Sequence, residues 1–155
     1  MRSGRRLAVD VGKVRVGLAI SDFHGILASP LQNIARQLED KETIQLILGA
    51  IAQEDILEIY VGLPVSMSGK ASASTDDAIG IASTLQSATS IPVRMIDERL
   101  TTVSASAALR SSGKSSKDGR KVIDQIAATM ILEQALAMEK NIGAAPGTPL
   151  DGLNV

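Results

Sequence analysis

The sequence contains no cysteine, which excludes disulfide bonds, zinc–thiolate centres and cysteine nucleophiles. It has one histidine, His24, so a histidine-rich metal site is excluded as well, and no nucleophile-elbow motif accompanies that residue. Tryptophan is absent, and the only other aromatic side chains are Phe23 and Tyr60, too few for a platform on which bases stack. The groups left for catalysis are carboxylates, hydroxyls and lysines. Carboxylates are typical ligands of hard cations such as Mg²⁺ and Mn²⁺.

The sequence also lacks a strong overall charge and any long apolar run. The net charge is −1, so binding to nucleic acid would have to come from local basic patches. No apolar run reaches the roughly 18 residues of a membrane span, and no secretory signal follows the basic start, so we expect a cytoplasmic protein. A length of 155 residues suits one domain, and we expect it to cover residues 1–140, followed by a flexible tail over 141–155.

The apolar pattern predicts an α/β protein. Three apolar runs separated by turn residues, 7–11, 14–20 and 25–34, indicate an antiparallel meander. Helical spacing then alternates with strand-like runs, giving helices over 39–53, 75–88 and 122–138 and strands over 56–63 and 92–97. Thr101 or Thr102 could cap a short helix to about Leu109, and the basic stretch 111–119 reads as flexible. This order favours a mixed five-stranded sheet with helices on both faces.

Three acidic positions stand where apolar residues would be expected. Asp10 interrupts the first strand, Asp97 and Glu98 end the fifth, and Asp124 lies on the apolar side of the last helix. Taken singly, each acid could cap a helix or form an ion pair. Gathered together, carboxylates repel one another unless a cation neutralises them, and two divalent ions would suit in-line displacement at a phosphodiester. The acids therefore predict metal-dependent hydrolysis.

Basic residues lie close to these acids in the sequence and could hold phosphates in a patch, although a solvated loop is the competing interpretation. They are Lys13, Arg15, Arg99, Arg110, Lys114, Lys117, Arg120 and Lys121.

Four segments in the same order resemble the motifs of one family. The first runs from Asp10 through Gly12, Lys13 and Arg15 to Ala19, with Ser21-Asp22 after it. The others are Val61-Gly62-Leu63-Pro64 with Gly69, then Asp97-Glu98-Arg99-Leu100-Thr101-Thr102 with Ala105, and finally Ile123-Asp124 with Ala127-Ala128 and Ile131-Leu132. Together they resemble the YqgF family, also called RuvX, over roughly residues 5–140.

The resemblance implies a ribonuclease H-like fold and a nuclease that acts on pre-16S rRNA in ribosome biogenesis. It implies that Asp10, Glu98 and Asp124 are catalytic and bind Mg²⁺ or Mn²⁺, with Asp97 as the alternative to Glu98. Gly12 would let the backbone come close to a phosphate or a metal-bound water, and Arg15 and Arg99 would meet phosphates or carboxylates.

The sequence is also compatible with other functions. The related RuvC resolvases cut DNA four-way junctions with the same chemistry, usually as dimers, so a Holliday-junction resolvase and a homodimer are alternatives. A non-catalytic nucleic-acid-binding protein of the same fold is another, and contact with ribosomal particles accompanies the rRNA hypothesis. An actin-like ATPase, whose first phosphate loop resembles Asp10-Val11-Gly12, needs two domains, for which 155 residues are too few.

Overall fold

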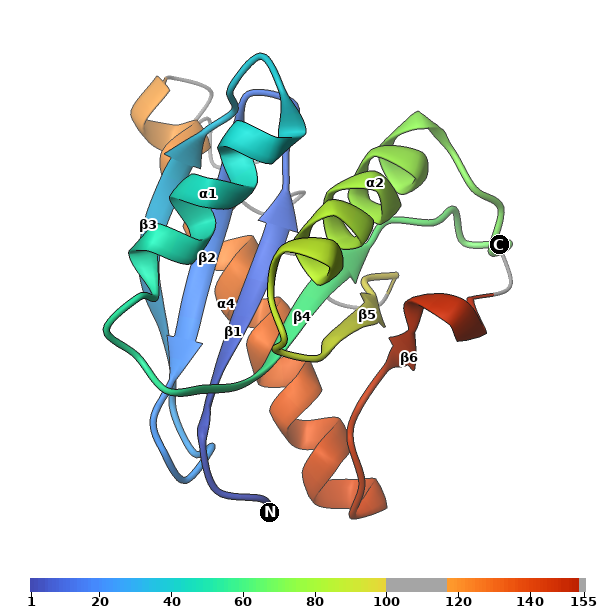
Figure 1. Cartoon of the computed structure of the whole chain (residues 1–155). Coiled ribbons are helices and arrows are strands. Elements are labelled where there is room, and N and C mark those ends of the chain that lie inside the picture. The colour runs from blue at the N-terminus through green and yellow to red at the C-terminus, as the bar shows by residue number, and fades with distance from the viewer. Residues whose placement is uncertain (100–116, 154–155) are drawn as a thin grey trace.

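The computed structural model describes residues 1–99 and 117–153, except for the side chains of residues 117–125. Six strands form one sheet in the order β3-β2-β1-β4-β5-β6 (Figure 1). β1 (Arg5–Val11) pairs antiparallel with β2 (Arg15–Ser21), which pairs antiparallel with β3 (Ala28–Ala35). β4 (Ile56–Leu63) and β5 (Val93–Asp97) continue the sheet in parallel with β1. The antiparallel meander and the mixed sheet predicted from the sequence are therefore confirmed.

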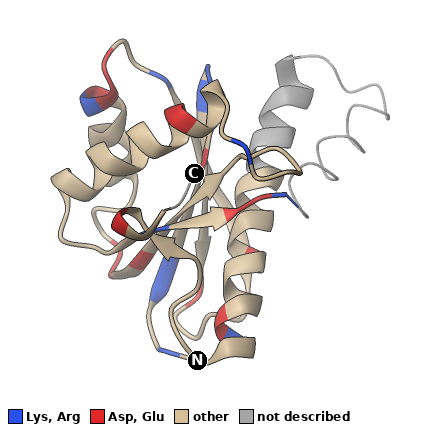
Figure 2. Ribbon diagram, turned by 90° about the vertical axis from the view of Figure 1, so that its right-hand side faces the viewer, with Lys and Arg blue, Asp and Glu red and all other residues tan. Residues whose placement is uncertain are grey.

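Helices cover both faces of this sheet, as predicted. α1 (Asp40–Ala50) and α2 (Ala73–Ala88) lie on one face, and α4 (Lys117–Ile142) crosses the other (Figures 1 and 2). Strand alternation sends neighbouring residues to opposite sides, so Leu7 and Val9 join the larger core under α1 and α2. Ala8 joins the smaller core under α4, with Tyr60 and Ile96. We call the side of the sheet that carries Ala8 the α4 face.

The helix ends follow local sequence signals. Ser72 caps α2, and its side chain and that of Thr75 bond each other's backbone amides in a capping box. The Thr75 hydroxyl also donates to the carbonyl of Pro64, which joins the start of α2 to the loop that follows β4. α1 and α2 begin and end within three residues of the predicted helices. α4 is longer than the predicted 122–138, because it takes in the end of the basic stretch at Lys117 and runs on to Ile142.

The sixth strand was not predicted. We expected residues 141–155 to form a flexible tail, whereas α4 continues to Ile142 and the chain then turns back along the sheet. β6 (Thr148–Pro149) pairs antiparallel with β5, and the short 3-10 helix η1 (Leu150–Gly152) follows. Arg94 of β5 donates to the carbonyls of Pro146 and Gly147 at 2.6 and 2.8 Å, so the segment is held by long-range contacts that sequence pattern does not reveal.

Two further findings bear on the sequence predictions. The short helix expected over 101–109 lies outside the described residues. Among the helices that the structure describes, none combines the length and apolar character needed to cross a membrane.

Candidate active site

Asp10 lies near the end of β1, the strand at the centre of the site. It is half-buried, and alternation along β1 puts it on the α4 face with Ala8. Its partner in the β1–β2 register is Gly17, which has no side chain to fill the space beside the carboxylate. On the other side, β1 pairs with β4 up to Val9 and Val61, so Gly62 is the next residue along β4. Asp10 therefore has a glycine beside it on both neighbouring strands.

Glu98 directly follows β5 and turns its side chain back under α4. Its amide donates to the carbonyl of Leu63 at 3.3 Å, and the residue is only 7% exposed. The carboxylate packs on Gly62: a Cβ added there would lie 2.7 Å from Glu98 Oε2 and 2.6 Å from Ile131 Cδ1. Glu98 thus fits between β4 and α4 only because residue 62 is glycine. The sequence analysis assigned no role to Gly62, although a glycine inside an apolar strand is a signal of such close packing.

Asp10 and Glu98 come together on one side and one edge of the sheet. β1, β4 and β5 are parallel, so their carboxyl ends meet at the same edge. Both acids lie on the α4 face at this edge, with Gly62 of the intervening strand between them. The two acids are far apart in the sequence, and the parallel pairing brings them together.

Asp97 is differently placed. It pairs with Leu63 in the β4–β5 register and follows Met95 by two residues, so it belongs to the side of the sheet where those apolar residues pack. Its carboxylate accepts from Arg99 Nη2 at 2.6 Å and from Nε at 2.9 Å, and also accepts from the Arg99 amide at 3.0 Å. Partial burial alone would raise the pKa of Asp97, but the hydrogen bonds and charge of Arg99 outweigh it and the pKa is lowered. Asp97 is thus an ionised partner of Arg99.

Arg99 stands where two pockets meet. The first, of about 400 Å³, is lined by Met67, Asp97, Arg99 and Gln134. The second, of about 310 Å³, is also lined by Asp97 and Arg99, together with residues of β4, β5 and the C-terminal segment. Arg99 also donates to the carbonyl of Met67 at 3.3 Å, and about a third of its side chain is exposed. A guanidinium fixed in this way can meet an anion without first being ordered.

The turn between β1 and β2, together with the first residue of β2, holds three of the predicted substrate-binding residues. The Gly12 amide donates to the Arg15 carbonyl at 2.9 Å and closes the turn, which leaves Lys13 exposed and Arg15 half-buried. Arg36 fixes this turn from outside: its Nη1 donates to the Gly12 carbonyl at 2.9 Å and to Asp77 of α2 at 2.8 Å. Sequence reasoning missed Arg36 and Asp77, because nothing local marks a contact between residues 41 positions apart.

The remaining predicted residues cannot be compared with this geometry. Lys114 lies outside the described residues. Four others fall within α4 at positions whose side chains are not described: Lys117, Arg120, Lys121 and Asp124. Within the part of the chain whose side chains are described, no group of three His, Cys, Asp or Glu residues could hold a metal ion. Two acids are described at the site, Asp10 and Glu98. Both carry the oxygen donors that Mg²⁺ and Mn²⁺ prefer.

Comparison with known proteins gives a consistent family. The model of the RuvX family, described as Holliday junction resolvase, matches residues 4–138. A protein of Clavibacter michiganensis subsp. michiganensis, provisionally named pre-16S rRNA nuclease, is 52% identical over 147 residues, which cover 95% of this chain and 91% of that protein. A protein of Leifsonia xyli subsp. xyli with the same name is 48% identical over 151 residues, 97% of each chain.

A solved structure shares the fold at low sequence identity. It is T. thermophilus RuvC in complex with Holliday junction substrate, with a TM-score of 0.56 and 16% identity, and the match covers 94% of this chain and 99% of that one. The likeness confirms the predicted ribonuclease H-like fold. Because the family model spans β1 to β5 and most of α4, and the two relatives match almost end to end, the chain belongs to the RuvX family.

Proposed function

We propose that this protein is a divalent-metal-dependent nuclease that hydrolyses phosphodiester bonds in the precursor of 16S rRNA. The observation that carries the proposal is the meeting of Asp10 and Glu98 on the α4 face, at the carboxyl ends of neighbouring parallel strands. Carboxylates on the same face at one edge of the sheet repel each other, and a divalent cation bound by both would offset that repulsion. The relatives' shared name supplies the substrate class.

The chemistry of the donors fits Mg²⁺ or Mn²⁺. Asp10 and Glu98 would be two of the ligands, and Asp124 of α4 would be the third, as the resemblance to the family implies. A bound divalent ion would supply a water of lowered pKa and would neutralise charge on the phosphate. Glu98 would serve here rather than Asp97, because Asp97 already accepts hydrogen bonds from three groups of Arg99, its amide, Nε and Nη2. These carboxylates would hold the ion, and the buried position of Glu98 would keep bulk water away from it.

The basic residues near the site would bind the nucleic-acid backbone. Arg99 is preorganised by Asp97 and the Met67 carbonyl, and its exposed part borders a pocket into which a phosphate could enter. Lys13 is exposed on the turn that follows Asp10, and Arg15 begins the next strand. Lys114, Lys117, Arg120 and Lys121 remain candidates from the sequence for longer-range contacts.

One other function has support of its own. The family model carries the description Holliday junction resolvase, which makes a DNA four-way junction the second candidate substrate. The two candidates share the acids and differ in the nucleic acid, so one assay can compare them.

The test uses purified protein with a pre-16S rRNA leader fragment and with a DNA four-way junction, each in Mg²⁺, Mn²⁺ or EDTA. Asp10→Asn and Glu98→Gln should each lower the cleavage rate by roughly 100-fold or more, the scale of losing a key electrostatic group at a reacting centre. Asp55→Asn, an exposed acid beside the amino end of β4, is the matched control and should cut at the wild-type rate. Binding without cleavage by wild type would instead indicate a non-catalytic nucleic-acid-binding protein.

A further inference from the structure

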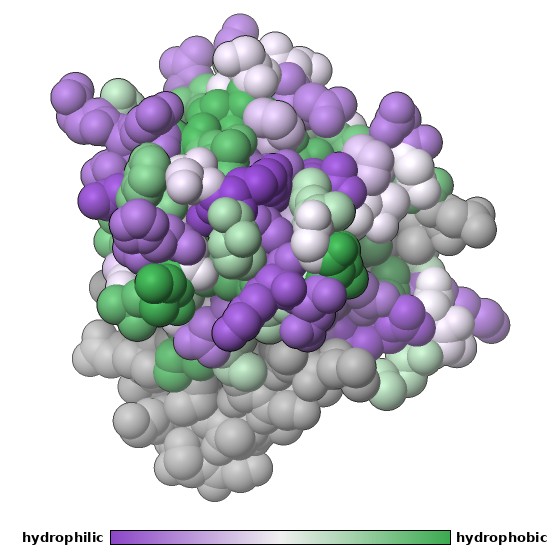
Figure 3. All heavy atoms as spheres, turned by 90° about the horizontal axis from the view of Figure 1, so that it is seen from below, coloured by the Kyte–Doolittle hydropathy of each residue, from purple (hydrophilic) through white to green (hydrophobic). Residues whose placement is uncertain are grey.

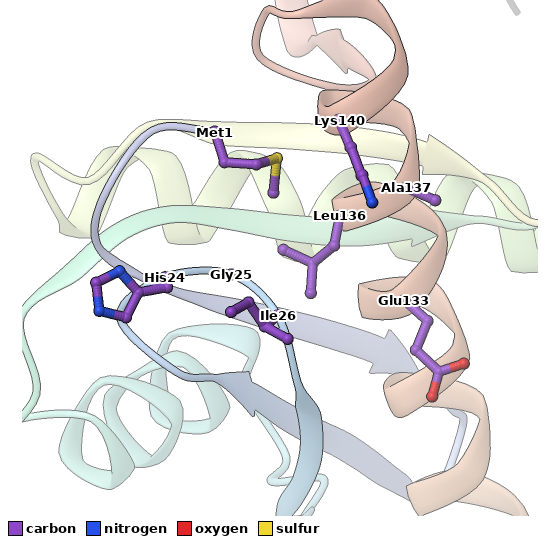
Figure 4. Close-up of a pocket in the computed structure, with 8 residues that line it drawn as sticks. All are labelled: Met1, His24, Gly25, Ile26, Glu133, Leu136, Ala137 and Lys140. Atoms are coloured by element: carbon purple, nitrogen blue, oxygen red, sulfur yellow. The ribbon is translucent and has the colours of Figure 1, made fainter.

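Two surface pockets lie at opposite ends of the sheet. One, of about 400 Å³, lies at the amino end of β1, where Ile26 of the β2–β3 turn and Leu136 of α4 line it (Figure 4). Figure 3 views this end of the molecule and shows hydrophobic side chains among hydrophilic ones. The other, of about 310 Å³, lies at the carboxyl ends of β4 and β5 and is lined by Asp97 and Arg99. We call the first the distal pocket and the second the edge pocket.

The walls of the edge pocket are mainly aliphatic and come from separate parts of the chain. Leu63 and Met95 line it from the strands and are buried. Val65 of the loop after β4 also lines it, as do Thr148 and Leu153 of the C-terminal segment, which lies beside β5 (Figure 1). Pockets of about 300–1,000 Å³ with apolar walls and a few polar groups are typical small-ligand sites. The edge pocket therefore suits one compact, mostly apolar group with a polar edge.

Arg99 lines the edge pocket in a fixed position. Its Nε and Nη2 donate to Asp97 at 2.9 and 2.6 Å, and its Nη1 donates to the carbonyl of Met67 at 3.3 Å. The loop that contains Met67 packs on the guanidinium, because a Cβ added to Gly69 would lie 3.5 Å from Arg99 Nη1. An arginine side chain has five N–H groups, of which these contacts use three, so two have no partner among the described residues. Those two groups suit the oxygens of a phosphate.

The position of Arg99 connects the edge pocket to the acids of the site. Glu98 and Arg99 are consecutive, so a phosphate on Arg99 belongs to a nucleotide close to the one at the acids. Asp10 and Glu98 lie on the α4 face, whereas Leu63 of the edge pocket belongs to the opposite side of the sheet. A nucleic-acid strand that crosses the sheet edge at Arg99 can therefore turn a base away from the acids into the edge pocket. A base must leave its duplex to enter a protein pocket, so this nucleotide is unpaired.

Building on the proposed function, we infer that the edge pocket binds the base of an unpaired nucleotide whose phosphate is held by Arg99. The faces of the base pack against Val65, Leu153 and the plane of the guanidinium, a surface on which bases stack. The edge of the base meets the polar groups of Asp97 and Thr148. The described residues that line the pocket include no aromatic side chain, so aliphatic groups and one guanidinium hold the base.

The first experiment is methyl NMR of the full-length protein in EDTA, titrated to millimolar concentrations with nucleoside 5′-monophosphates. Ribose 5-phosphate, which has no base, is the control ligand. The nucleotides should shift the methyl signals of Val65, Met95 and Leu153, and ribose 5-phosphate should not. The methyl signals of Ile26 and Leu136 in the distal pocket should stay in place with every ligand. Nucleotides that shift no edge-pocket signal, or shift it no more than ribose 5-phosphate does, would overturn the inference.

Filling the pocket gives a second test with a longer ligand. Val65→Phe and Leu153→Phe should each weaken binding of single-stranded RNA by roughly tenfold, the scale of losing the contacts of one base. Both variants should bind a blunt RNA duplex as wild type does, because a paired base does not enter the pocket. Ile26→Phe, in the distal pocket and 81% exposed, is the matched control and should change neither affinity.

The outcomes separate this inference from the proposed nuclease activity. Binding is measured in EDTA, so it does not depend on cleavage, and unfolding midpoints confirm that the variants fold. If the filling variants bind single-stranded RNA as wild type does, or lose single strand and duplex equally, the edge pocket does not hold a base. Base-dependent binding by a protein that cuts neither substrate would contradict the nuclease proposal and leave the pocket assignment intact.

Discussion

Gly62 determines where the carboxylate of Glu98 can lie. The Glu98 side chain occupies the space that a side chain at residue 62 would need, against Ile131 of α4. Asp97, one residue earlier, takes the opposite side of the strand and pairs with Arg99. Strand alternation therefore sends the two neighbouring acids to opposite sides of the sheet, and the missing Cβ at residue 62 leaves room for the carboxylate of Glu98.

Gly62→Ala tests this relation. The added methyl should displace the Glu98 carboxylate, lowering Mn²⁺ affinity and cleavage by roughly tenfold, and should destabilise the fold by about 1–3 kcal/mol through overpacking. Calorimetric titration with Mn²⁺ and the cleavage assay measure both effects. Gly80→Ala on α2 is the matched control, because a Cβ there meets nothing within 4 Å and alanine favours a helix. Equal behaviour of the two variants would show that the contact with Gly62 does not position Glu98.

At the scale of elements, a buried ion cluster fastens the carboxyl-terminal part of α4 to β1. Arg6 is fully buried on β1, and its Nη2 donates to Glu139 of α4 at 2.9 Å. Arg2 reaches the same carboxylate at 2.6 Å and joins it to Glu58 of β4 at 2.8 Å. Burial alone would raise the pKa of Glu139, but the hydrogen bonds from Arg2 and the charges of Arg6 and Arg2 outweigh it and lower the pKa.

The lowered pKa gives the cluster a defined pH dependence. A carboxyl group whose pKa is lower in the folded state stabilises the fold above its ordinary pKa of 4.5, and this stability is lost as the pH falls through the folded-state value. The free energy of unfolding should therefore decrease as the pH is lowered below about 4.5, because Glu139 is then protonated in the unfolded chain while it is still ionised in the folded protein.

Glu139→Gln should remove much of that acid dependence and cost about 3–5 kcal/mol at neutral pH, because Arg6 is left buried without its anionic partner. Urea unfolding at a series of pH values measures both quantities. Glu42→Gln, an exposed acid on α1, is the comparison and should keep the acid dependence. A Glu139→Gln protein that matches wild type at every pH would mean that α4 is held by its apolar contacts alone.

At the scale of the whole molecule, the C-terminal segment completes the sheet beside the site. β6 covers the edge of β5, and η1 helps to line the pocket that contains Asp97 and Arg99. Gly147 permits this return: its φ is +75°, and a side chain there would meet the carbonyl of Met95. β6, the last strand in the sequence, thus lies beside Arg94 and Met95 of β5, the strand that ends at Asp97.

Truncation after Gly143 tests whether this segment belongs to the fold. Removing it exposes the edge of β5 and frees Arg94 from two carbonyl partners, so we expect a loss of about 1–3 kcal/mol in the free energy of unfolding. Denaturant unfolding measures the loss, and the cleavage assay tests whether Arg99 keeps its place. Full stability of the truncated protein would support the flexible tail predicted from the sequence.

Local patterns in the sequence predicted β1 to β5, the described helices and the order of these elements. The alternation of apolar residues identified the meander and the parallel strands, and helical spacing identified α1, α2 and α4, because these signals are local and repeat every two or about 3.6 residues. The motif residues also pointed to the RuvX family and to its ribonuclease H-like fold, which the comparisons confirm. The predicted count of five strands was one too few, because the two residues of β6 are too short to show an alternation of apolar and polar residues.

Which distant residues meet depends on the folded protein and cannot be read from local sequence. Local sequence could not tell Asp97 from Glu98, because their roles depend on the register of β5 against β4 and on the space above Gly62. It could not reveal that Arg36 ties the Gly12 turn to Asp77, or that Arg94 holds the returning chain. Such contacts join residues tens of positions apart, and their geometry exists only once the sheet has formed and the helices have packed on it.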